Sequence, residues 1–460
     1  MMQKVFDNNK IKSFIEENHK DEVRFENIVF DDKEAFMFDS VKPCYVFNNC
    51  YFKSHRFDFV VKKIRRQKEY LAIVFKNCVF ESDVFISGCE LENLEITDCE
   101  FHSKRFVVAE SKIKRVGIIN NPNCAKTIDN IHFHSENEID YLDMRLLSVT
   151  GAFNIDESNI KEFYAAKNSF KHIYFKKLKV EEKLTFWDNS IEKNSTISNS
   201  SIGKSLFRDS KFYNVLNFFE TNFLQITSFE CIKTTENSTV KISNCSFENK
   251  VFFDNSFLGI LKLDTSFFSD IVSFQNFQCN TIELNRVHFD KVAFFNDINI
   301  KLLRSLDVKT ISIIKNQLNK TDNNIDYVKM NALEKRKFFQ SLSRKNTDFF
   351  VLWLNKISNN FGTSWLKGIW FTLKCSAIFF VMLLAVNNFV KSSYPLSINI
   401  KHDWAKFDFI LAEFLKFIFS FGFTSPEFQS SGWLFLIFIV AKIFIGFGIY
   451  QTIAAFRKFK

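Results

Sequence analysis

The chain has 460 residues, a formal net charge of +9, and 61 Phe against only 4 Pro and 11 Gly. This composition excludes a disordered chain and predicts two or three domains with a large core in which one bulky apolar residue is used repeatedly. The positive charge argues against a mimic of DNA, which needs an acidic surface, and by itself leaves anionic lipid or nucleic acid as a possible partner.

The N-terminal segment has no apolar stretch of signal-peptide length. We therefore expect the first 300 residues to lie in the cytosol, where disulfides are rare. The ten cysteines therefore need a role other than disulfide formation. Zinc binding is not indicated either, because the sequence contains no CxxC pair. Six of them stand two positions before an apolar residue, namely Cys44 and Val46, Cys50 and Phe52, Cys78 and Phe80, Cys89 and Leu91, Cys99 and Phe101, and Cys245 and Phe247.

Apolar residues recur with a period of five or ten residues. They occupy positions 75, 80, 85, 91, 96, 101 and 106, and Phe residues stand ten apart at 247, 257, 267 and 277. A helix needs a period of 3.6 and a strand a period of 2, so neither explains this pattern. A square coil with five residues per side does, because each side then points one large side chain inward and a small one two positions earlier. The residues expected to point inward include Cys78, Phe80, Cys89, Leu91, Cys99, Phe101, Cys245, Phe247, Phe257, Phe267 and Phe277.

Other small residues take the place of cysteine in the same pattern. Ser158 precedes Ile160 by two positions, Ser210 precedes Phe212, Thr221 precedes Phe223, and Thr265 precedes Phe267. A turn-forming residue often comes just before the small one, and we expect it to lie at a corner of the coil. These turn-formers are Asn49, Asn77, Asp98, Asp209 and Asn244.

This unit of a turn-former, a small residue and a central Phe or Leu resembles the pentapeptide-repeat proteins over roughly residues 22–300. The resemblance implies a right-handed quadrilateral β-helix, which we expect to form a first domain over residues 1–306. Cys and Ser replace the Ala that is usual in that family, and the segment VVKKIRRQKEY at 60–70 interrupts the repeat.

Little in the sequence points to catalysis. Buried Cys and Phe are expected to pack in the core, where Cys behaves as a small hydrophobe. His132 and His134 share one face of an extended segment that Glu136 follows, but without further ligand spacing a solvated strand face is the favoured interpretation over a metal site. Motifs such as GxxxxGK, GxSxG and HExxH are absent from the sequence. The sequence therefore predicts neither an enzyme nor a cofactor.

Residues 307–364 change to helical spacing. Ile311, Ile314 and Leu318 fall on one helix face, and residues 321–324 are expected to separate two helices. The simpler interpretation is a cap that closes the end of the β-helix, and the alternative is a connector that passes conformational change to the membrane.

Two apolar runs in the last domain, 365–460, are long enough to cross a bilayer. They cover residues 369–390 and 433–456. Arg344, Lys345, Lys356 and Lys367 precede the first run, and Arg457, Lys458 and Lys460 follow the second, so the positive-inside rule predicts that both termini are cytoplasmic. Lys374 and Lys442 lie inside the runs, where a lysine must reach the surface, line water or face a partner.

A shorter apolar segment at 404–423 lies between the runs and leads into a polar turn. The order of span, half-helix, turn and span resembles the two-helix pore module of tetrameric ion channels. Phe423, Thr424, Ser425, Pro426 and Glu427 stand where a potassium channel has Thr-Val-Gly-Tyr-Gly, so potassium selectivity is not implied. The turn is either an altered pore loop, in which Gly422, Thr424, Ser425, Glu427 and Lys442 would line a constriction, or part of an interfacial amphipathic segment.

Two functions follow as hypotheses. The first is a non-enzymatic, multi-pass protein of the bacterial inner membrane whose cytosolic β-helix binds a protein partner. The second is a homo-oligomeric pore, not selective for potassium, that the β-helix gates. Nucleic acid is not an expected partner, and the lipid bilayer is a partner in both hypotheses.

Overall fold

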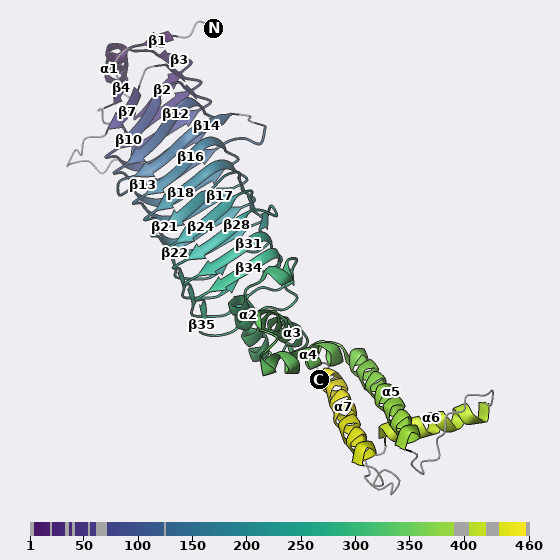
Figure 1. The fold of residues 1–460 in the computed structure, drawn as a ribbon. Helices are drawn as coiled ribbons and strands as arrows, with labels where there is room; N and C mark the ends of the chain where they lie inside the picture. The colour runs from purple at the N-terminus through teal and green to yellow at the C-terminus, as the bar shows by residue number, and fades with distance from the viewer. Residues whose placement is uncertain are drawn as a thin grey trace. The chain divides into compact units, whose positions relative to one another are not determined.

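A computed structural model describes residues 4–18, 21–32, 36–38, 42–53, 56–60, 71–123, 126–390, 404–419 and 432–456. The chain divides into two compact units, Met1–Thr310 and Ile311–Lys460. The first unit is a β-solenoid, and the helices that follow it include two long apolar ones (Figure 1).

Two parallel sheets build the solenoid, because the chain adds one strand or a pair of short strands to each sheet in every turn. The first sheet contains β1 (Lys4–Phe6), β3 (Ile28–Phe30), β4 (Phe36–Phe38), β6 (Tyr51–Phe52), β7 (Arg56–Val60), β9 (Val79–Phe80), β10 (Asp83–Ser87), β12 (Glu100–Ala109), β14 (Thr127–His134), β16 (Ser148–Asp156), β18 (Ser169–Lys176), β20 (Ser190–Ile191), β21 (Ser195–Ser198), β23 (Lys211–Phe212), β24 (Val215–Phe219), β27 (Lys233–Thr234), β28 (Thr239–Ser243), β31 (Phe257–Asp264), β34 (Gln278–Asn285) and β37 (Asn299–Ile300). The second contains β2 (Glu22–Glu26), β5 (Cys44–Asn48), β8 (Leu71–Lys76), β11 (Glu90–Thr97), β13 (Lys112–Ile119), β15 (Glu138–Arg145), β17 (Asn159–Ala166), β19 (Lys179–Trp187), β22 (Ser201–Arg208), β25 (Asn222–Phe223), β26 (Thr227–Ser228), β29 (Ser246–Phe247), β30 (Val251–Phe252), β32 (Phe267–Phe268), β33 (Val272–Ser273), β35 (His288–Phe289) and β36 (Ala293–Phe294).

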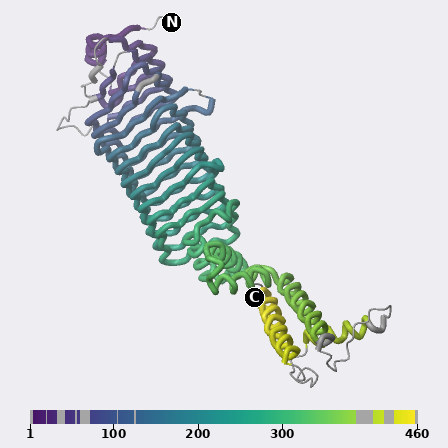
Figure 2. The backbone as a smooth tube through the Cα atoms, viewed as in Figure 1, coloured from purple at the N-terminus to yellow at the C-terminus, as the bar shows by residue number. Residues whose placement is uncertain are grey.

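Equivalent residues of successive turns lie side by side. Leu142 pairs with Phe163, which pairs with Leu184, and all three side chains are buried. The same step of 21 residues separates Leu147 from Asn168, and the Asn168 side chain accepts a hydrogen bond from the backbone N–H of Leu147. About 13 such turns stack over residues 4–300 (Figure 2). The predicted stacking of coils is therefore confirmed.

Single residues with left-handed backbone form the corners. The turn role predicted for Asn49, Asn77, Asp98, Asp209 and Asn244 is confirmed by their φ angles of 52° to 55°. Asn and Asp tolerate this conformation better than other residues with a side chain. The residue after each of these five corners is buried, so the corner fixes which side chains of the next strand enter the core.

Phe side chains form stacked columns through the core. Phe223, Phe247, Phe268 and Phe289 come from successive turns, and the distances between their ring centroids are 4.6, 4.6 and 5.2 Å. Another column contains Phe229, Phe253, Phe274 and Phe295 at 4.7 to 5.0 Å. These distances match the spacing of neighbouring strands, so each ring packs on the next at the pitch that the sheet imposes.

The predicted inward positions Phe257 and Phe267 are wrong. Phe267 is 42 % exposed and stacks on His288, while Phe257 is only half-buried and has the Lys301 ammonium 5.0 Å from its ring. Their neighbours Leu258 and Phe268 point inward instead. The cause is that columns repeat every 21 residues or so rather than every ten, and a shift of one residue exchanges the two faces of a strand.

Two other positions of the five-residue pattern also fail. Phe85 is half-buried on the outside, where the Arg56 guanidinium lies 3.9 Å from its ring. Cys44 is half-buried as well, and Tyr45 and Phe47 take the inward positions of that strand. Both errors have the same cause as those at Phe257 and Phe267: an offset of one residue in the predicted register moves a side chain from the inner to the outer face of the strand.

An N-terminal helix that the sequence did not predict covers the first turn. α1 (Asn8–Glu17) buries Ile11 and Ile15 and packs the Phe14 ring 5.2 Å from that of Phe25, which points inward from β2. This contact protects the open end of the hydrophobic column from water.

The second unit is helical. Its elements follow a short 3₁₀ helix, η1 (Leu303–Ser305), and are α2 (Val308–Lys320), α3 (Asn324–Ser341), α4 (Thr347–Asn359), α5 (Trp365–Val390), α6 (Trp404–Phe419) and α7 (Gly432–Phe456). The predicted face of Ile311, Ile314 and Leu318 is buried, and the break at 321–324 is confirmed by the end of α2 at Lys320. The hydroxyl of Thr310, the last residue of the first unit, accepts a hydrogen bond from the backbone N–H of Leu284 in β34.

Candidate membrane hairpin

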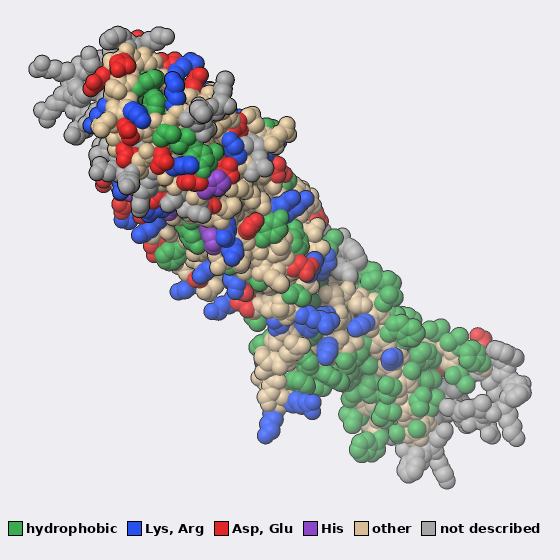
Figure 3. Space-filling model, turned by 90° about the horizontal axis from the view of Figure 1, so that it is seen from above, with side chains coloured by type: hydrophobic (Ala, Val, Ile, Leu, Met, Phe, Trp, Pro, Cys, Tyr) green, Lys and Arg blue, Asp and Glu red, His purple; other side chains and the backbone are tan. Residues whose placement is uncertain are grey.

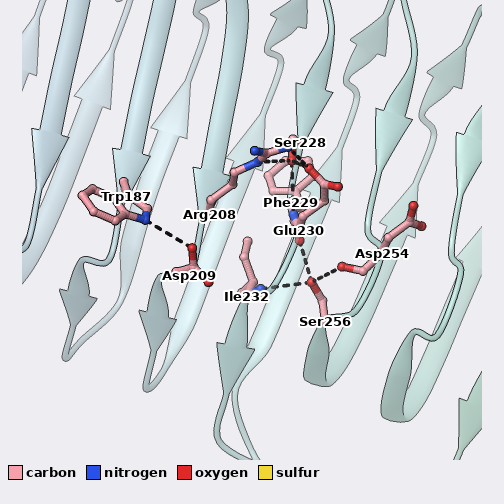
Figure 4. Close-up of polar contacts among 9 residues, drawn as sticks. All are labelled: Trp187, Arg208, Asp209, Ser228, Phe229, Glu230, Ile232, Asp254 and Ser256. Atoms are coloured by element: carbon pink, nitrogen blue, oxygen red, sulfur yellow. Dashed lines mark hydrogen bonds and ion pairs between the residues drawn. The ribbon is translucent and has the colours of Figure 1, made fainter.

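The small inward side chains of the solenoid are held by backbone hydrogen bonds. The Ser256 hydroxyl accepts the N–H of Ile232 and donates to the carbonyl of Phe229 at 2.6 Å (Figure 4). The side chains of Asn168 and Asn189 make equivalent bonds one turn apart: each accepts a backbone N–H and donates to a backbone carbonyl. Each column of small polar residues thus satisfies backbone groups at a corner that would otherwise be buried without partners.

The cysteines belong to the same columns. Cys78, Cys89, Cys99 and Cys245 are buried, and the backbone N–H of Cys78 lies 3.4 Å from the sulfur of Cys99 in the next turn. Burial raises the pKa of Cys245 to about 11 and that of Cys279 to about 12. These thiols stay protonated at neutral pH, which makes them poor nucleophiles and poor metal ligands.

His132 and His134 lie on the outer face of β14. The Nδ1 atom of His132 is 3.1 Å from the amide nitrogen of Asn154, and that of His134 is 2.8 Å from the hydroxyl of Ser135. Burial, together with Arg105 and His134, lowers the pKa of His132. Among the described residues, no group of three or more His, Cys, Asp or Glu side chains is arranged to hold a metal ion.

The long helices α5 and α7 form an antiparallel hairpin. Aromatic pairs follow its length, with ring centroids 5.0 Å apart for Trp365 and Phe456 and 5.7 Å apart for Phe379 and Phe444. By length and composition, both helices can cross a membrane, over Trp365–Val386 and Gly432–Phe456. On the face shown in Figure 3, hydrophobic side chains gather over the hairpin, whereas charges of both signs are spread over the solenoid.

A reciprocal pair of glycines sets the distance between the two helices. A Cβ atom on Gly368 would lie 3.0 Å from Cα of Thr452, and one on Gly448 would lie 3.2 Å from Cα of Thr372. The hydroxyls of Thr372 and Thr452 donate to the carbonyls of Gly368 and Gly448 in their own helices, at 2.9 Å each. The sequence interpretation missed this Gly-x-x-x-Thr spacing, which is typical of closely packed membrane helices.

We expect Gly448→Leu to separate the two helices and lower the free energy of unfolding of the detergent-solubilised protein by about 1–3 kcal/mol, because the new side chain has no room beside Thr372. Gly446→Leu is the matched control, since a Cβ there meets nothing within 4 Å. Chemical denaturation followed by circular dichroism measures both. Equal stability of the two variants would contradict the close contact.

The short helix α6 packs against both long helices and crosses α5 at a steep angle (Figure 1). Its Phe414 and Phe417 rings lie 5.5 and 5.6 Å from that of Phe380 on α5. These contacts belong to a buried apolar cluster shared by the three helices, which also contains Leu383, Leu384, Ile418, Leu434, Phe438, Ala441 and Ile445.

Lys442 links α7 to the C-terminal end of α6. Its ammonium donates to the carbonyl of Phe417 and lies 5.3 Å from the Phe417 ring and 5.1 Å from the Phe438 ring. The last four carbonyls of a helix lack intrahelical partners and carry the negative end of its dipole, so a cation is stabilised there. Lys374, by contrast, is exposed on α5.

The predicted turn residues Gly422, Thr424, Ser425 and Glu427 lie outside the described residues, as do Pro426 and the rest of 420–431. Of the candidate pore residues, only Lys442 is therefore placed.

A buried polar cluster joins α4 to α7, and the sequence interpretation missed it. The Asn359 side chain donates to the backbone carbonyl of Gln451 at 3.2 Å and also to its side-chain oxygen. The Gln451 amide donates to Asn355 at 3.0 Å, and Asn359 accepts the backbone N–H of Gly362. The end of α4 is thus held beside the last turns of α7 by bonds that span more than 90 residues of sequence.

Comparison of the chain with protein-family models, with curated proteins and with solved structures finds no match.

Proposed function

We propose that the protein is a membrane-anchored, non-enzymatic repeat protein that presents its solenoid to a protein partner in the bacterial cytosol. We further propose that the solenoid is a right-handed quadrilateral β-helix of the pentapeptide-repeat type. The short paired strands support four sides, since β25 and β26 are followed by β27 and β28 within one turn. At Asn77, Asp98 and Asn244 a left-handed corner residue is followed by a small buried one, as in the repeat that the sequence predicts.

The observation that carries the anchoring proposal is the exposed apolar surface of the hairpin. Trp370, Ile378 and Val381 on α5 and Trp433 and Ile443 on α7 are each 59–69 % exposed. A core helix of a soluble protein would bury such residues, and exposed apolar patches of this kind mark membrane or protein contacts. A bilayer is the simplest cover for side chains on outer faces of two helices that are each long enough to span it.

Charge supports a cytoplasmic position for the helices before the hairpin. Residues 308–367 contain eleven basic and four acidic residues, which is a net charge of +7 out of +9 for the whole chain. Four of these basic residues, Arg344, Lys345, Lys356 and Lys367, lie just before or at the start of the first span, where an excess of Lys and Arg is the usual signature of the cytoplasmic side.

Topology is the test of this orientation. A cysteine introduced at position 397, between the spans, should react with a membrane-impermeant maleimide added to intact spheroplasts, whereas one at position 460 should react only after lysis. The charge distribution predicts this result because the bilayer keeps strongly basic ends inside. The opposite labelling pattern would overturn the orientation, and labelling of both sites in intact spheroplasts would overturn the hairpin.

A homo-oligomeric pore is the alternative, and the position of α6 favours it. Lys442 lies about 15 Å along α7 from the start of that helix, yet it binds the end of α6. An interfacial helix lies only about 5–10 Å deep, so this depth agrees better with a re-entrant segment. A single hairpin cannot enclose a pore, and a monomer in detergent would therefore exclude this function.

A further inference from the structure

The helix α4 carries an apolar stripe that the fold leaves uncovered. Phe350, Trp353 and Ile357 are spaced as i, i+3 and i+7 and are 55, 40 and 39 % exposed. The Phe350 and Trp353 rings stack at 5.8 Å, so they form one continuous surface. This spacing places all three side chains on one face of the helix.

The opposite face of α4 is fixed to its own unit. Ser358 and Asn359 are buried, and at the side of the helix the Phe349 ring stacks on that of Phe339 at 4.8 Å. The bonds of Asn355 and Asn359 to Gln451 hold the C-terminal turn of α4 near the end of α7. Gln451 lies five residues before Phe456, or about 8 Å along the helix axis, so α4 sits at the depth where the hairpin would leave the hydrocarbon.

Basic side chains flank the stripe. Arg344 and Lys345 come just before α4, and Lys356 follows Trp353 by three residues at the side of the stripe, with its ammonium 5.0 Å from the Phe339 ring; all three are exposed. Aromatic residues beside cations suit the boundary between acyl chains and anionic headgroups. Leu366 and Trp370 at the start of α5, the next helix of the same unit, are also exposed.

We propose that α4 is an interfacial helix, with Phe350, Trp353 and Ile357 inserted among the acyl chains of an anionic bilayer and its basic residues bound to the headgroups. This inference rests on the proposed membrane anchoring. Because Asn355 and Asn359 tie α4 to α7, the helix would hold the cytosolic part of the chain to the membrane surface by a contact separate from the spans.

Spin labels on the full-length protein test the inference in vesicles of phosphatidylethanolamine and phosphatidylglycerol. Cysteines that react with the label are first replaced by serine, and single cysteines are then placed at Ile357 on the stripe, at Asp348 on the opposite face, and at Val381 in the span. We expect the labels at 357 and 381 to be relaxed more by oxygen than by a water-soluble nickel chelate. The label at 348 should show the reverse.

The three positions separate the possible failures. A water-exposed label at 357 with a lipid-exposed label at 381 would overturn the interfacial helix and leave the anchoring intact, whereas water exposure at both would overturn the anchoring as well. A label at 357 that neither reagent reaches would show that protein covers the stripe, which also contradicts the inference. Phe350→Asp combined with Trp353→Asp should move the 357 label into water, and vesicles of phosphatidylcholine alone should make it shallower.

Discussion

Phe268→Asp should destabilise the solenoid severely, while Phe267→Asp should have little effect. The Phe268 ring is fully buried and stacks on the rings of Phe247 and Phe289 at 4.6 and 5.2 Å. Removing a buried Phe costs about 3–5 kcal/mol, and an unpaired buried carboxylate adds to that cost. Phe267, one residue away, is 42 % exposed, and substitutions at such sites usually change stability by about 0.5 kcal/mol or less.

Urea unfolding of the two full-length variants, followed by far-ultraviolet circular dichroism, measures the difference. The pair is matched in composition and sequence position, so only the direction of the side chain differs. Similar losses of stability in both variants would contradict the register of β32. A fully stable Phe268→Asp protein would contradict the solenoid core itself.

The register at this point shows what the sequence could and could not settle. In the segment Thr265, Ser266, Phe267, Phe268, two overlapping pairs of a small residue and a Phe fit the repeat, and periodicity alone does not choose between them. The corner residue determines which pair points inward. Thr265 takes the left-handed conformation with φ 49°, so Ser266, the residue after it, and Phe268 are the buried pair. Corner residues at intervals of ten or eleven were the stronger signal, but only Asn and Asp corners are recognisable by type. At Lys167, Lys177, Glu220 and Arg286 the same conformation is adopted by residues with no turn preference.

The hairpin was predictable from hydropathy, but its internal packing was not. Length and apolar composition predict two helices that end close to where α5 and α7 do. The bonds between Asn359 and Gln451 join residues 92 apart, and no local pattern identifies such a pair. Gly368 and Gly448 could have been recognised, since each stands four residues before a Thr within an apolar run.

The sequence predicted that Lys442 needs a polar environment but did not identify its partner. A lysine near the middle of a span needs water, the membrane surface or a partner on another helix. The structure provides the partner, because the ammonium of Lys442 donates a hydrogen bond to the carbonyl of Phe417 at the end of α6. This contact could not be inferred from spacing, because its position depends on how α6 folds back against α5.

Lys442→Glu should therefore release the end of α6 from the hairpin. A favourably placed cation at a helix C-terminus contributes up to about 2 kcal/mol, so a charge of opposite sign should change the stability of this contact by roughly twice that amount. Lys374→Glu is the matched control, because it makes the same change of charge at an exposed position of α5. Hydrogen exchange of the α6 amides in the reconstituted protein should rise strongly for Lys442→Glu and little for Lys374→Glu.

The same pair of variants distinguishes the two proposed functions. If α6 is a re-entrant segment of a pore, Lys442→Glu should alter both the conductance and the ion selectivity of planar bilayers that contain the purified oligomer, since charges beside a narrow path set the local ion concentration. Lys442→Arg, which keeps the cation, should change selectivity much less. An anchor without a pore predicts faster hydrogen exchange in α6 but no current from any of the proteins. Unchanged exchange in Lys442→Glu would instead show that the bond between Lys442 and Phe417 does not hold α6 in place.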